Sequence, residues 1–346
     1  MPFIRFKSTH SLSVVCFAIL FSCTVPVVAD VLTMSDGSVL MGQVISQEKN
    51  TLKFKTSYAG TIKIKWDQVK HLKTDTPIKV MLADEKLIAA TSVHNNAGMS
   101  ELKEYNNQLA SVKTDTIAYI NPEPWRLNKG YKMSGRANLS LKSQYGNTEK
   151  DEFDLDARLE LRSIQDRYIF NGNLENDNSK GNTTADNWLF SGKYDYFVSK
   201  KRYYGFGLSF ERDKFTDLNL RTTLNPYVGH QFYESKALNL KAEIGLAKVY
   251  DDYIKADDID YMALNWHVSY DQYFFNELTQ FYHKHEGSYG LEKSDKLTFD
   301  SWTGLRFPLQ FGIVASTEIQ WEYDSQPQSS LHKSDTTYRL KFGYQW

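Results

Sequence analysis

Apolar and polar residues alternate one by one through the last two thirds of the chain. From Tyr131 to Leu141 the odd-numbered residues are apolar or small, whereas the even-numbered ones are polar or charged. The same alternation recurs from Phe153 to Leu161 and continues, with interruptions, to Trp346. An α-helix would spread these charges around all its sides, so the pattern predicts strands with one apolar face. We count about twelve strands of about ten to fourteen residues, the length of a strand that crosses a membrane at a tilt.

The segments between these strands alternate in length. Residues 164–167 and 199–202 are short connections, whereas residues 176–186 and 251–260 are long and polar. Barrels of the bacterial outer membrane have short turns on the periplasmic side and longer loops outside. The pattern therefore predicts an all-β chain in which residues 131–346 form an antiparallel transmembrane β-barrel with both ends in the periplasm.

The last strand ends on an aromatic residue, with apolar residues at every second position before it. These residues are Tyr338, Leu340, Phe342, Tyr344 and Trp346. The pattern resembles the C-terminal signal that the barrel-assembly machinery recognises, so we expect that machinery, outer-membrane lipid and lipopolysaccharide to be partners of the chain. A soluble β-sandwich shares the strand period, but it has no reason to end on an exposed Trp.

The first residues have the features of a secretory signal peptide, which we place at residues 1–29. A positively charged start precedes an apolar segment at residues 12–21 and a small-residue cleavage site at Ala29. An alternative interpretation is a lipobox that ends in a lipidated Cys23. Cys23 and Cys16 are the only cysteines, so a mature chain that starts near residue 30 is expected to have no disulfide.

Residues 30–121 predict a β-rich periplasmic domain. The Asp36-Gly37 pair between apolar runs is a tight-turn signal. Residues 30–75 suggest about five short strands, as in a small SH3-like or Sm-like barrel, and residues 76–121 contain a weaker echo of them. Two prolines then interrupt the pattern and predict a linker at residues 122–130.

Several of these segments together resemble the YdiY-like family of salt-induced outer-membrane proteins. They are the run DGSVLMGQV at residues 36–44, Tyr58-Ala59-Gly60 with the alternating residues 62–66, the Ile120-Asn121-Pro122 junction and the terminal barrel. The resemblance implies an outer-membrane barrel without a catalytic signature and with a link to salt or osmotic stress. It supplies no functional residues.

Composition narrows the function further. The chain has 41 Lys and Arg against 42 Asp and Glu, a net charge of −1, which argues against a nucleic-acid partner because such a partner requires a basic surface. The mean hydropathy of −0.51 is compatible with a barrel, since only every second residue of its strands faces lipid. The 22 Tyr and 20 Phe fit the aromatic girdles of such barrels.

One residue pair raises the alternative of an outer-membrane lipid hydrolase, similar to a phospholipase. His267 and Ser269 lie two residues apart, with Asn265 and Asp271 on the same face of a predicted strand. The intervening Trp266 and its apolar neighbours are the lipid-facing set, so His267 and Ser269 are expected to point into the lumen, away from lipid. We interpret the pair as polar lumen lining and expect no enzyme activity.

Two groups could bind metal ions. His283 and His285 share one face of a strand, but no third ligand is visible, and we interpret them as a solvated barrel rim. Five aspartates in the predicted loop 251–260 could bind Ca²⁺ or the cations that bridge lipopolysaccharide, but they lack the spacing of an EF-hand. We therefore expect no metal and no cofactor.

The predicted inward face carries charges of both signs. Examples are Arg158, Lys193 and Lys341 against Asp195 and Glu243. We therefore expect salt bridges to cross a narrow lumen. The sequence as a whole predicts a non-enzymatic outer-membrane barrel that acts as a narrow channel or as a structural or stress-related envelope protein. Its periplasmic domain would bind an unknown partner or occlude the pore.

Overall fold

A computed structural model describes residues 29–48, 50–144, 150–179, 182–235, 237–275, 277–291, 295–327 and 332–346. The chain divides into two compact units, Met1–Pro122 and Glu123–Trp346. The expected signal peptide and its alternative lipobox lie outside the described residues, except for Ala29. No helix in the described part of the chain is long and apolar enough to cross a membrane.

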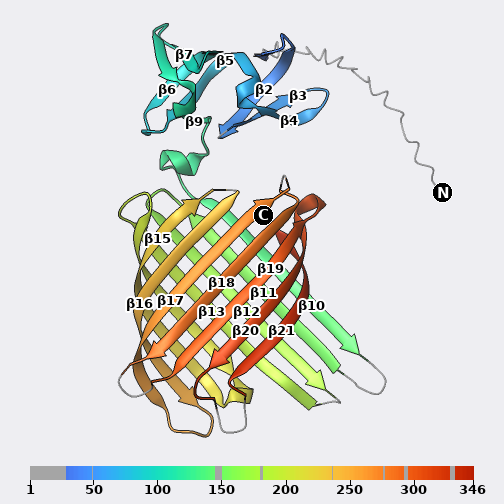
Figure 1. Ribbon diagram of the computed structural model, residues 1–346, viewed down its shortest axis with the longest axis vertical. Coiled ribbons are helices and arrows are strands. Elements are labelled where there is room, and N and C mark those ends of the chain that lie inside the picture. Colours follow the sequence, from blue (N-terminus) through green and yellow to red (C-terminus); the bar gives the residue numbers. More distant parts are fainter. Residues whose placement is uncertain are drawn as a thin grey trace, which may run out of the picture. The chain divides into compact units, whose positions relative to one another are not determined.

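The N-terminal unit is an antiparallel sheet of nine strands (Figure 1). The strands are β1 (Asp30–Met34), β2 (Val39–Glu48), β3 (Thr51–Thr56), β4 (Gly60–Lys65), β5 (Val69–Leu82), β6 (Leu87–Asn96), β7 (Met99–Glu104), β8 (Leu109–Lys113) and β9 (Ile117–Ile120). Two short 3-10 helices, η1 (Trp66–Gln68) and η2 (Thr114–Thr116), precede β5 and β9.

The two halves of this sheet repeat one strand order around the long strand β5. The first part of β5 pairs with β1, so the first half runs β5-β1-β2-β3-β4. The second part pairs with β6 and with β9, so the second half runs β9-β5-β6-β7-β8. A single cluster of buried side chains, among them Leu32, Phe54 and Leu102, fills both halves. The halves therefore share one core.

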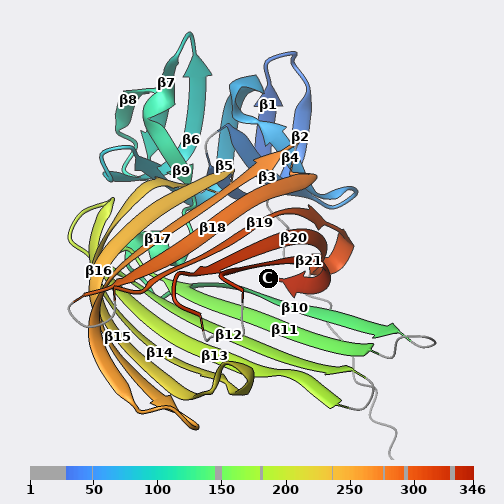
Figure 2. The same ribbon diagram turned by 60° about the horizontal axis from the view of Figure 1, so that its bottom comes forward.

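The C-terminal unit is a closed antiparallel barrel of twelve strands, which confirms the predicted fold (Figures 1 and 2). The strands are β10 (Lys132–Gln144), β11 (Lys150–Arg162), β12 (Asp166–Ser179), β13 (Asn182–Phe197), β14 (Arg202–Asp213), β15 (Leu218–Glu234), β16 (Leu238–Tyr253), β17 (Ile259–Phe274), β18 (Thr279–Gly290), β19 (Leu297–Pro308), β20 (Ile313–Asp324) and β21 (Ser334–Gln345). We call the end at which β10 begins and β21 ends the terminal end, and the opposite end the distal end.

Some predicted boundaries within the barrel are wrong. β15 has 17 residues, more than the ten to fourteen expected. β12 extends to Ser179 and β13 begins at Asn182, so the long loop predicted at residues 176–186 is a strand hairpin. The loop predicted at residues 251–260 is shorter in the structure and spans residues 254–258. Polar residues suggested loops at these places, but a strand that extends beyond a membrane pairs equally well with polar side chains on both faces.

The predicted linker contains a 3-10 helix, η3 (Pro124–Leu127). Trp125 is buried there and its indole N–H donates to the Glu123 carboxylate at 2.6 Å. The guanidinium of Arg162, at the end of β11, lies 6.0 Å from the Trp125 ring. This contact fixes η3 against the terminal end of the barrel, to whose compact unit it belongs.

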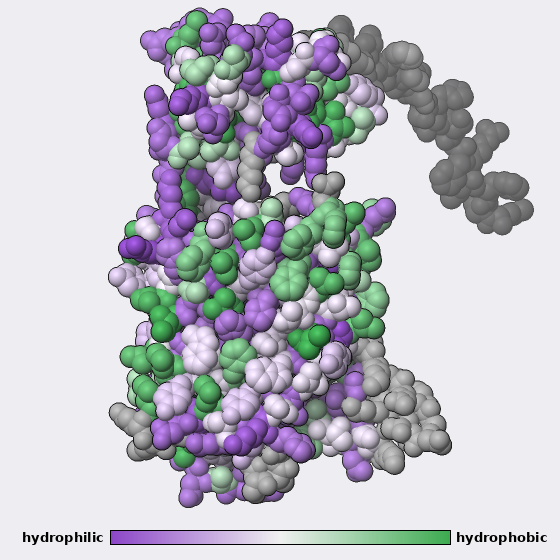
Figure 3. Space-filling model, in the orientation of Figure 1, coloured by the Kyte–Doolittle hydropathy of each residue, from purple (hydrophilic) through white to green (hydrophobic). Residues whose placement is uncertain are grey.

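The barrel wall has the alternation that the sequence predicted. Large apolar side chains remain exposed on its outer face, and apolar residues spread over it in Figure 3. Phe170, Phe206 and Ile244, on three different strands, are 48%, 48% and 51% exposed. Buried charged residues such as Arg167, Asp195 and Glu243 lie on the inner face. The barrel is therefore apolar outside and charged inside, the reverse of a water-soluble protein.

Candidate functional site in the barrel lumen

A buried ion pair lies in the lumen near the terminal end. Arg167 on β12 donates from Nε to Oδ2 of Asp195 on β13 at 2.7 Å, and their side chains are 4% and 0% exposed. Asp195 also accepts a 2.5 Å hydrogen bond from the Tyr227 hydroxyl. Arg167 Nη1 donates to Gln231 Oε1 at 3.0 Å. Since β12 and β15 are separated by two strands, this last bond crosses the interior of the barrel.

A second group is centred on Glu243 of β16. Its carboxylate accepts hydrogen bonds from the Tyr203 hydroxyl at 2.9 Å and from Lys241 Nζ at 2.8 Å. Lys193 of β13 also binds Glu243 and thereby crosses two intervening strands. The Lys193 ammonium lies 4.6 Å from the ring centre of Tyr227, which links this group to the first ion pair. Cation–π contacts of this kind are stronger where water is excluded.

The contacts continue along the wall from β15 to β19. Gln231 Nε2 donates to Asn239 Oδ1 at 2.6 Å, and Asn239 Nδ2 donates to Asp271 Oδ1 at 3.1 Å. Gln280 Nε2 donates to the other oxygen of Asp271 at 3.1 Å. Gln280 Oε1 in turn accepts a 3.1 Å bond from Arg306 Nη1. Each polar group thus finds its partner on the next strand.

The remaining contacts continue from β19 to β21 and on to β10 and β11. The Arg306 guanidinium lies 3.6 Å from the ring centre of Tyr282, whose hydroxyl donates to Glu318 Oε2 at 2.9 Å. Lys341 of β21 pairs with Glu318 at 2.7 Å and with Asp156 of β11 at 3.2 Å. Asp156 accepts a 2.8 Å bond from Asn138 of β10.

We call this ring of polar residues the belt. It is composed of Asn138, Asp156, Arg167, Lys193, Asp195, Tyr203, Tyr227, Gln231, Asn239, Lys241, Glu243, Asp271, Gln280, Tyr282, Arg306, Glu318 and Lys341. It has a member on each of the twelve strands. Nearer the turns, Arg162 of β11 reaches Glu234 of β15 at 2.9 Å and crosses the interior again.

Several belt residues are buried to a degree that is unusual for polar and charged groups. Gln231, Arg167 and Lys241 are 1%, 3% and 4% exposed. Charged side chains are almost never this buried unless they are paired. The belt therefore lines the lumen near the terminal end with paired side chains, some of which reach across two intervening strands, and the prediction that ion pairs cross the lumen is confirmed.

Sequence reasoning found only part of the belt. It assigned Lys193, Asp195 and Glu243 to the inner face, but it did not single out Tyr203 or Tyr227. The alternation does indicate the position of Tyr203. Tyr204 and Phe206 point outward, so Tyr203 between two outward positions lies on the inner face. The hydrogen bonds of Tyr203 and Tyr227 join strands that are not neighbours, which no local pattern reveals.

The structure places His267 beside Glu243. His267 Nδ1 lies 3.4 Å from Glu243 Oε2, and the His267 side chain is 15% exposed. His267 and Ser269 belong to β17 and their side chains share its inner face. The Glu243 carboxylate also binds two lysine ammonium groups and a tyrosine hydroxyl. The arrangement around His267 is therefore a buried polar cluster centred on Glu243.

His283 and His285 do not lie at a solvated rim, and that interpretation is wrong. They pair with Tyr270 and Val268 in the middle of β18, on the outer face of the wall. His285 stacks on Phe299 at a centroid distance of 5.4 Å. β18 continues to Gly290, so the histidines lie in mid-strand and not at its end, and their pairing with outward residues of β17 places them on the outer face.

The aspartates of residues 251–260 do not gather around one point. Asp251 is inward and accepts from Arg221 Nε at 2.7 Å, whereas Asp260 pairs with Lys248. Among the described residues, no group of three or more His, Cys, Asp or Glu side chains has a geometry that could hold a metal ion.

The predicted assembly-signal residues point outward from β21. Tyr338, Leu340, Phe342, Tyr344 and Trp346 are 76%, 71%, 65%, 53% and 45% exposed. An outward aromatic series at the terminal end fits the interfacial girdle of a membrane barrel.

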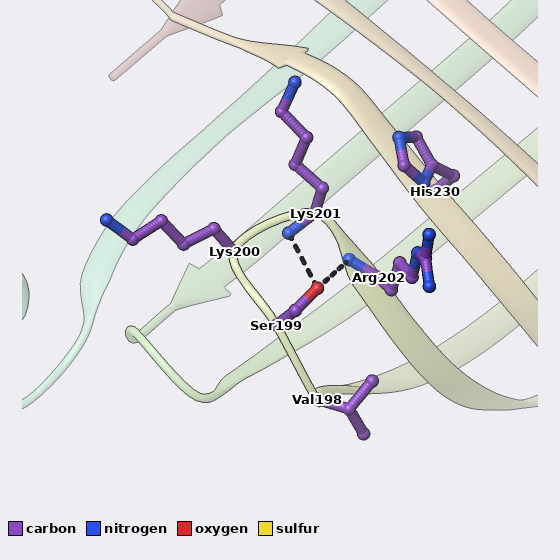
Figure 4. Close-up of a pocket in the computed structure, with 6 residues that line it drawn as sticks. All are labelled: Val198, Ser199, Lys200, Lys201, Arg202 and His230. Atoms are coloured by element: carbon purple, nitrogen blue, oxygen red, sulfur yellow. Dashed lines mark hydrogen bonds between the residues drawn. The ribbon is translucent and has the colours of Figure 1, made fainter.

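A basic hollow lies at the terminal end beside the turn between β13 and β14. It is lined by Val198, Ser199, Lys200, Lys201, Arg202 and His230 (Figure 4). The Ser199 hydroxyl accepts the backbone N–H of Arg202 at 3.0 Å, which tightens the turn. Figure 4 shows the side chains of Lys200 and Lys201 extending away from this turn in different directions.

Comparisons with known proteins concern the barrel. The family model described as "Protein of unknown function, DUF481" matches residues 137–346. No curated protein matches the chain. The solved NanC porin is 12% identical and covers 62% of this chain and 99% of its own, with a TM-score of 0.40. The β domain of the Bordetella autotransporter BrkA is 10% identical and covers 63% and 99%, with a TM-score of 0.33. OmpT of Vibrio cholerae is 9% identical and covers 62% and 97%, also with a TM-score of 0.33.

Proposed function

We propose that this chain, which belongs to the DUF481 family of proteins of unknown function, is an outer-membrane barrel whose lumen is closed to solutes by the belt. It would pass at most small ions and would not act as a general diffusion pore. The observation that carries the proposal is the burial of the belt: Arg167 and Asp195 are 3% and 0% exposed inside the barrel.

The outer face of the barrel supports a membrane location. In a soluble protein, exposed residues such as Phe206 and Ile244 would contact water. This contact costs a free energy of about 25 cal/mol for each Å² of apolar surface. In a bilayer the same surface contacts hydrocarbon. A closed barrel also pairs its backbone groups internally, as a membrane-spanning structure requires. Lys200, Lys201 and Arg202 at the terminal rim suit the phosphate headgroups of a membrane surface.

The terminal end is proposed to face the periplasm. Residues 30–121 would then form a periplasmic domain that binds a partner there. Protease added to intact cells should leave this domain uncut, and cleavage should require a permeabilised outer membrane. Cleavage in intact cells would reverse the orientation.

The number of strands is compatible with a closed lumen. A barrel of eight strands is just wide enough for side chains to fill its interior, whereas barrels of sixteen to eighteen leave an aqueous channel. This barrel has twelve strands, so its width alone does not decide whether water passes. The ion pairs from Arg162 to Glu234 and from Lys193 to Glu243 join strands that are not neighbours and thus cross part of that width.

Single-channel recording tests the proposal. The refolded full-length chain in a planar bilayer should show little conductance. The double variant Arg167→Ser with Asp195→Ser removes both partners of a buried ion pair of the belt, so no unpaired charge is left behind, and it should conduct several-fold more. The matched control Arg221→Ser with Asp251→Ser removes a pair on the adjacent strands β15 and β16 and should change little. Passage of a disaccharide by the unmodified protein in liposome swelling would overturn the proposal.

The proposed function is non-enzymatic. The position of His267 beside Glu243 supports this because a lipid substrate would have to reach a half-buried residue inside the lumen. The same refolded sample should not hydrolyse an ester substrate. Turnover that His267→Ala abolishes would favour the hydrolase alternative instead.

The link to salt stress is a separate proposal that is supported only by the resemblance to YdiY-like proteins. Protein levels should rise several-fold when NaCl is added to growing cells but not when an equivalent osmolarity of sucrose is added. Equal levels in all three media would contradict a salt-specific role.

A further inference from the structure

Four polar side chains lie in the middle of the outer wall of the barrel. We call them the polar patch, and they are His283 and His285 of β18 with Ser301 and Thr303 of β19. His285 pairs across the sheet with Ser301, and His283 pairs with Thr303. Their partners on β20, Trp321 and Ile319, are 40% and 47% exposed on the outer face. Figure 3 shows hydrophilic residues among the hydrophobic ones in the middle of this wall.

The polar patch lies at the depth of the hydrocarbon if the barrel spans a membrane. The two histidines are the fifth and seventh of the twelve residues of β18. Ser301 and Thr303 are likewise the fifth and seventh of the twelve residues of β19. The apolar band of an outer-membrane barrel is about 25 Å tall, so residues in mid-strand lie about 12 Å from either edge of it. Lipid headgroups stay at those edges, and acyl chains offer no hydrogen-bond partner.

The patch satisfies only part of its own hydrogen-bonding capacity. The two ring nitrogens of His283 lie 2.8 Å from the Thr303 hydroxyl and 3.1 Å from Nδ1 of His285. Within the described part of the chain, His285 Nε2 and the Ser301 hydroxyl have no hydrogen-bond partner. Polar groups that face lipid are costly and mark functional surfaces. A partner for these two groups must therefore come from outside the barrel.

An aromatic groove adjoins the patch on its distal side. It has a volume of about 460 Å³ and is lined by Trp266, Leu297, Phe299, Trp321 and Tyr323. His285 stacks on Phe299 at a centroid distance of 5.4 Å and thereby joins the groove to the patch. A Cβ at Gly287 would meet the Trp266 ring at 2.0 Å, so the glycine lets this ring lie against β18. Neither the groove nor the patch contains Lys, Arg, Asp or Glu, and an uncharged partner fits them both.

We propose that the outer face of β17–β20 binds the same face of a second copy of this chain, with the polar patch at the centre of the interface. His285 Nε2 and the Ser301 hydroxyl would form hydrogen bonds with the polar patch of the other copy. Imidazole and hydroxyl groups can each donate and accept a hydrogen bond. A contact between two identical surfaces requires this property, because every group meets a surface of its own kind.

Membrane geometry favours a second copy over a lipid. Two copies that insert with the same orientation are related by an axis along the membrane normal, and rotation about that axis leaves the depth of every residue unchanged. The polar patch then meets a polar patch, and the aromatic groove meets aromatic side chains. A phospholipid does not match in this way, because its polar headgroup lies at another depth than the patch. The interface rests on the proposed membrane location but not on a closed lumen.

Cysteine cross-linking in vesicles tests the interface with the full-length chain. In a background with Cys16→Ser and Cys23→Ser, Ser301→Cys places a thiol in the patch. The control Leu208→Cys lies outward on β14, five strands around the barrel. With a short bismaleimide, Ser301→Cys should give a several-fold larger dimer fraction than Leu208→Cys, and this fraction should persist when the lipid-to-protein ratio is raised. Equal fractions at the two sites, or loss of the dimer on dilution with lipid, would overturn the interface.

Replacing the histidines tests the role of the patch. The double variant His283→Leu with His285→Leu should lower the dimer fraction at Ser301→Cys several-fold, because hydrogen bonds across the interface are lost and lipid covers leucine equally well. The wall already has outward leucine at Leu305, which is 38% exposed, so the barrel should still fold. The matched control Thr222→Leu changes an outward polar residue of β15 and should leave the dimer fraction unchanged. An undiminished dimer in the histidine variant would contradict the proposed centre.

Native mass spectrometry of the unmodified chain distinguishes a second copy from a bound lipid. We expect the mass of two chains in detergent and the mass of one chain for the histidine variant. A single chain that retains a phospholipid, which the histidine variant releases, would assign the patch to a lipid and overturn the interface.

Heat modifiability separates failure of the interface from failure of the membrane location. A chain that inserts into vesicles as a heat-modifiable band but stays monomeric would overturn the interface alone. A chain that forms no heat-modifiable, membrane-bound species would contradict the proposed location itself.

Discussion

Replacing Asp195 by Asn should strongly destabilise the barrel. The Asp195 side chain is 0% exposed and accepts from Arg167 at 2.7 Å and from Tyr227 at 2.5 Å. Removing one partner of a buried ion pair costs about 3–5 kcal/mol, because the other charge stays buried without compensation. The Gln231 amide oxygen still accepts from Arg167, so we expect the lower end, about 3 kcal/mol.

The assay is urea unfolding of the refolded chain in lipid vesicles, followed by tryptophan fluorescence. The matched control is Asp186→Asn, which breaks the pair with Lys214, whose two side chains are 33% and 42% exposed. An exposed pair of this kind contributes about 0–1 kcal/mol. The double variant Arg167→Met with Asp195→Leu removes both charges and should recover most of the lost stability. A difference of less than about 1 kcal/mol between Asp195→Asn and Asp186→Asn would refute the stabilising role of the buried pair.

Three other substitutions probe separate parts of the chain. Gly229→Ala should cost about 1–3 kcal/mol in the same assay, because the new methyl group meets the Tyr203 ring, whereas Gly207→Ala, whose Cβ would lie 3.7 Å from its nearest neighbour, should be neutral. Burial, with the nearby positive groups, lowers the pKa of His71 below its ordinary value. The unfolded state then binds more protons below about pH 6.5, so the N-terminal domain should lose stability as the pH falls from 7.5 to 5. Hydrogen exchange in the full chain would measure this loss, and its persistence in His71→Gln would contradict the assignment. Deleting Trp346 should lower the fraction of heat-modifiable barrel in membranes, and unchanged assembly would argue against the C-terminal signal.

Much of the barrel could be predicted from the chain alone because strand alternation has a period of two. Once the odd-numbered residues from Tyr131 to Leu141 are assigned to one face, the face of every following residue of that strand is determined until a turn interrupts the alternation. The alternation correctly predicted the twelve strands and the inward position of Lys193 and Glu243. It failed at residues 176–186, where polar residues form a hairpin and not a loop.

The same rule explains the error at His283 and His285. Alternation tells which residues share a face, but which face it is depends on the register with the neighbouring strand. The pairing of His285 with Val268 places both histidines outward. A one-residue difference in register would have reversed the assignment.

By itself, the sequence determined the strands, their number and the separation of apolar from charged residues. Only the tertiary structure decided which charges meet and that the strands close into a barrel. Lys193 and Glu243 are 50 residues apart in the chain, and their contact depends on the tilt and stagger of all the strands between them. The pairing of β10 with β21 likewise depends on the closure of the whole ring. Local patterns carry no information about closure, because each strand reports only its own two faces.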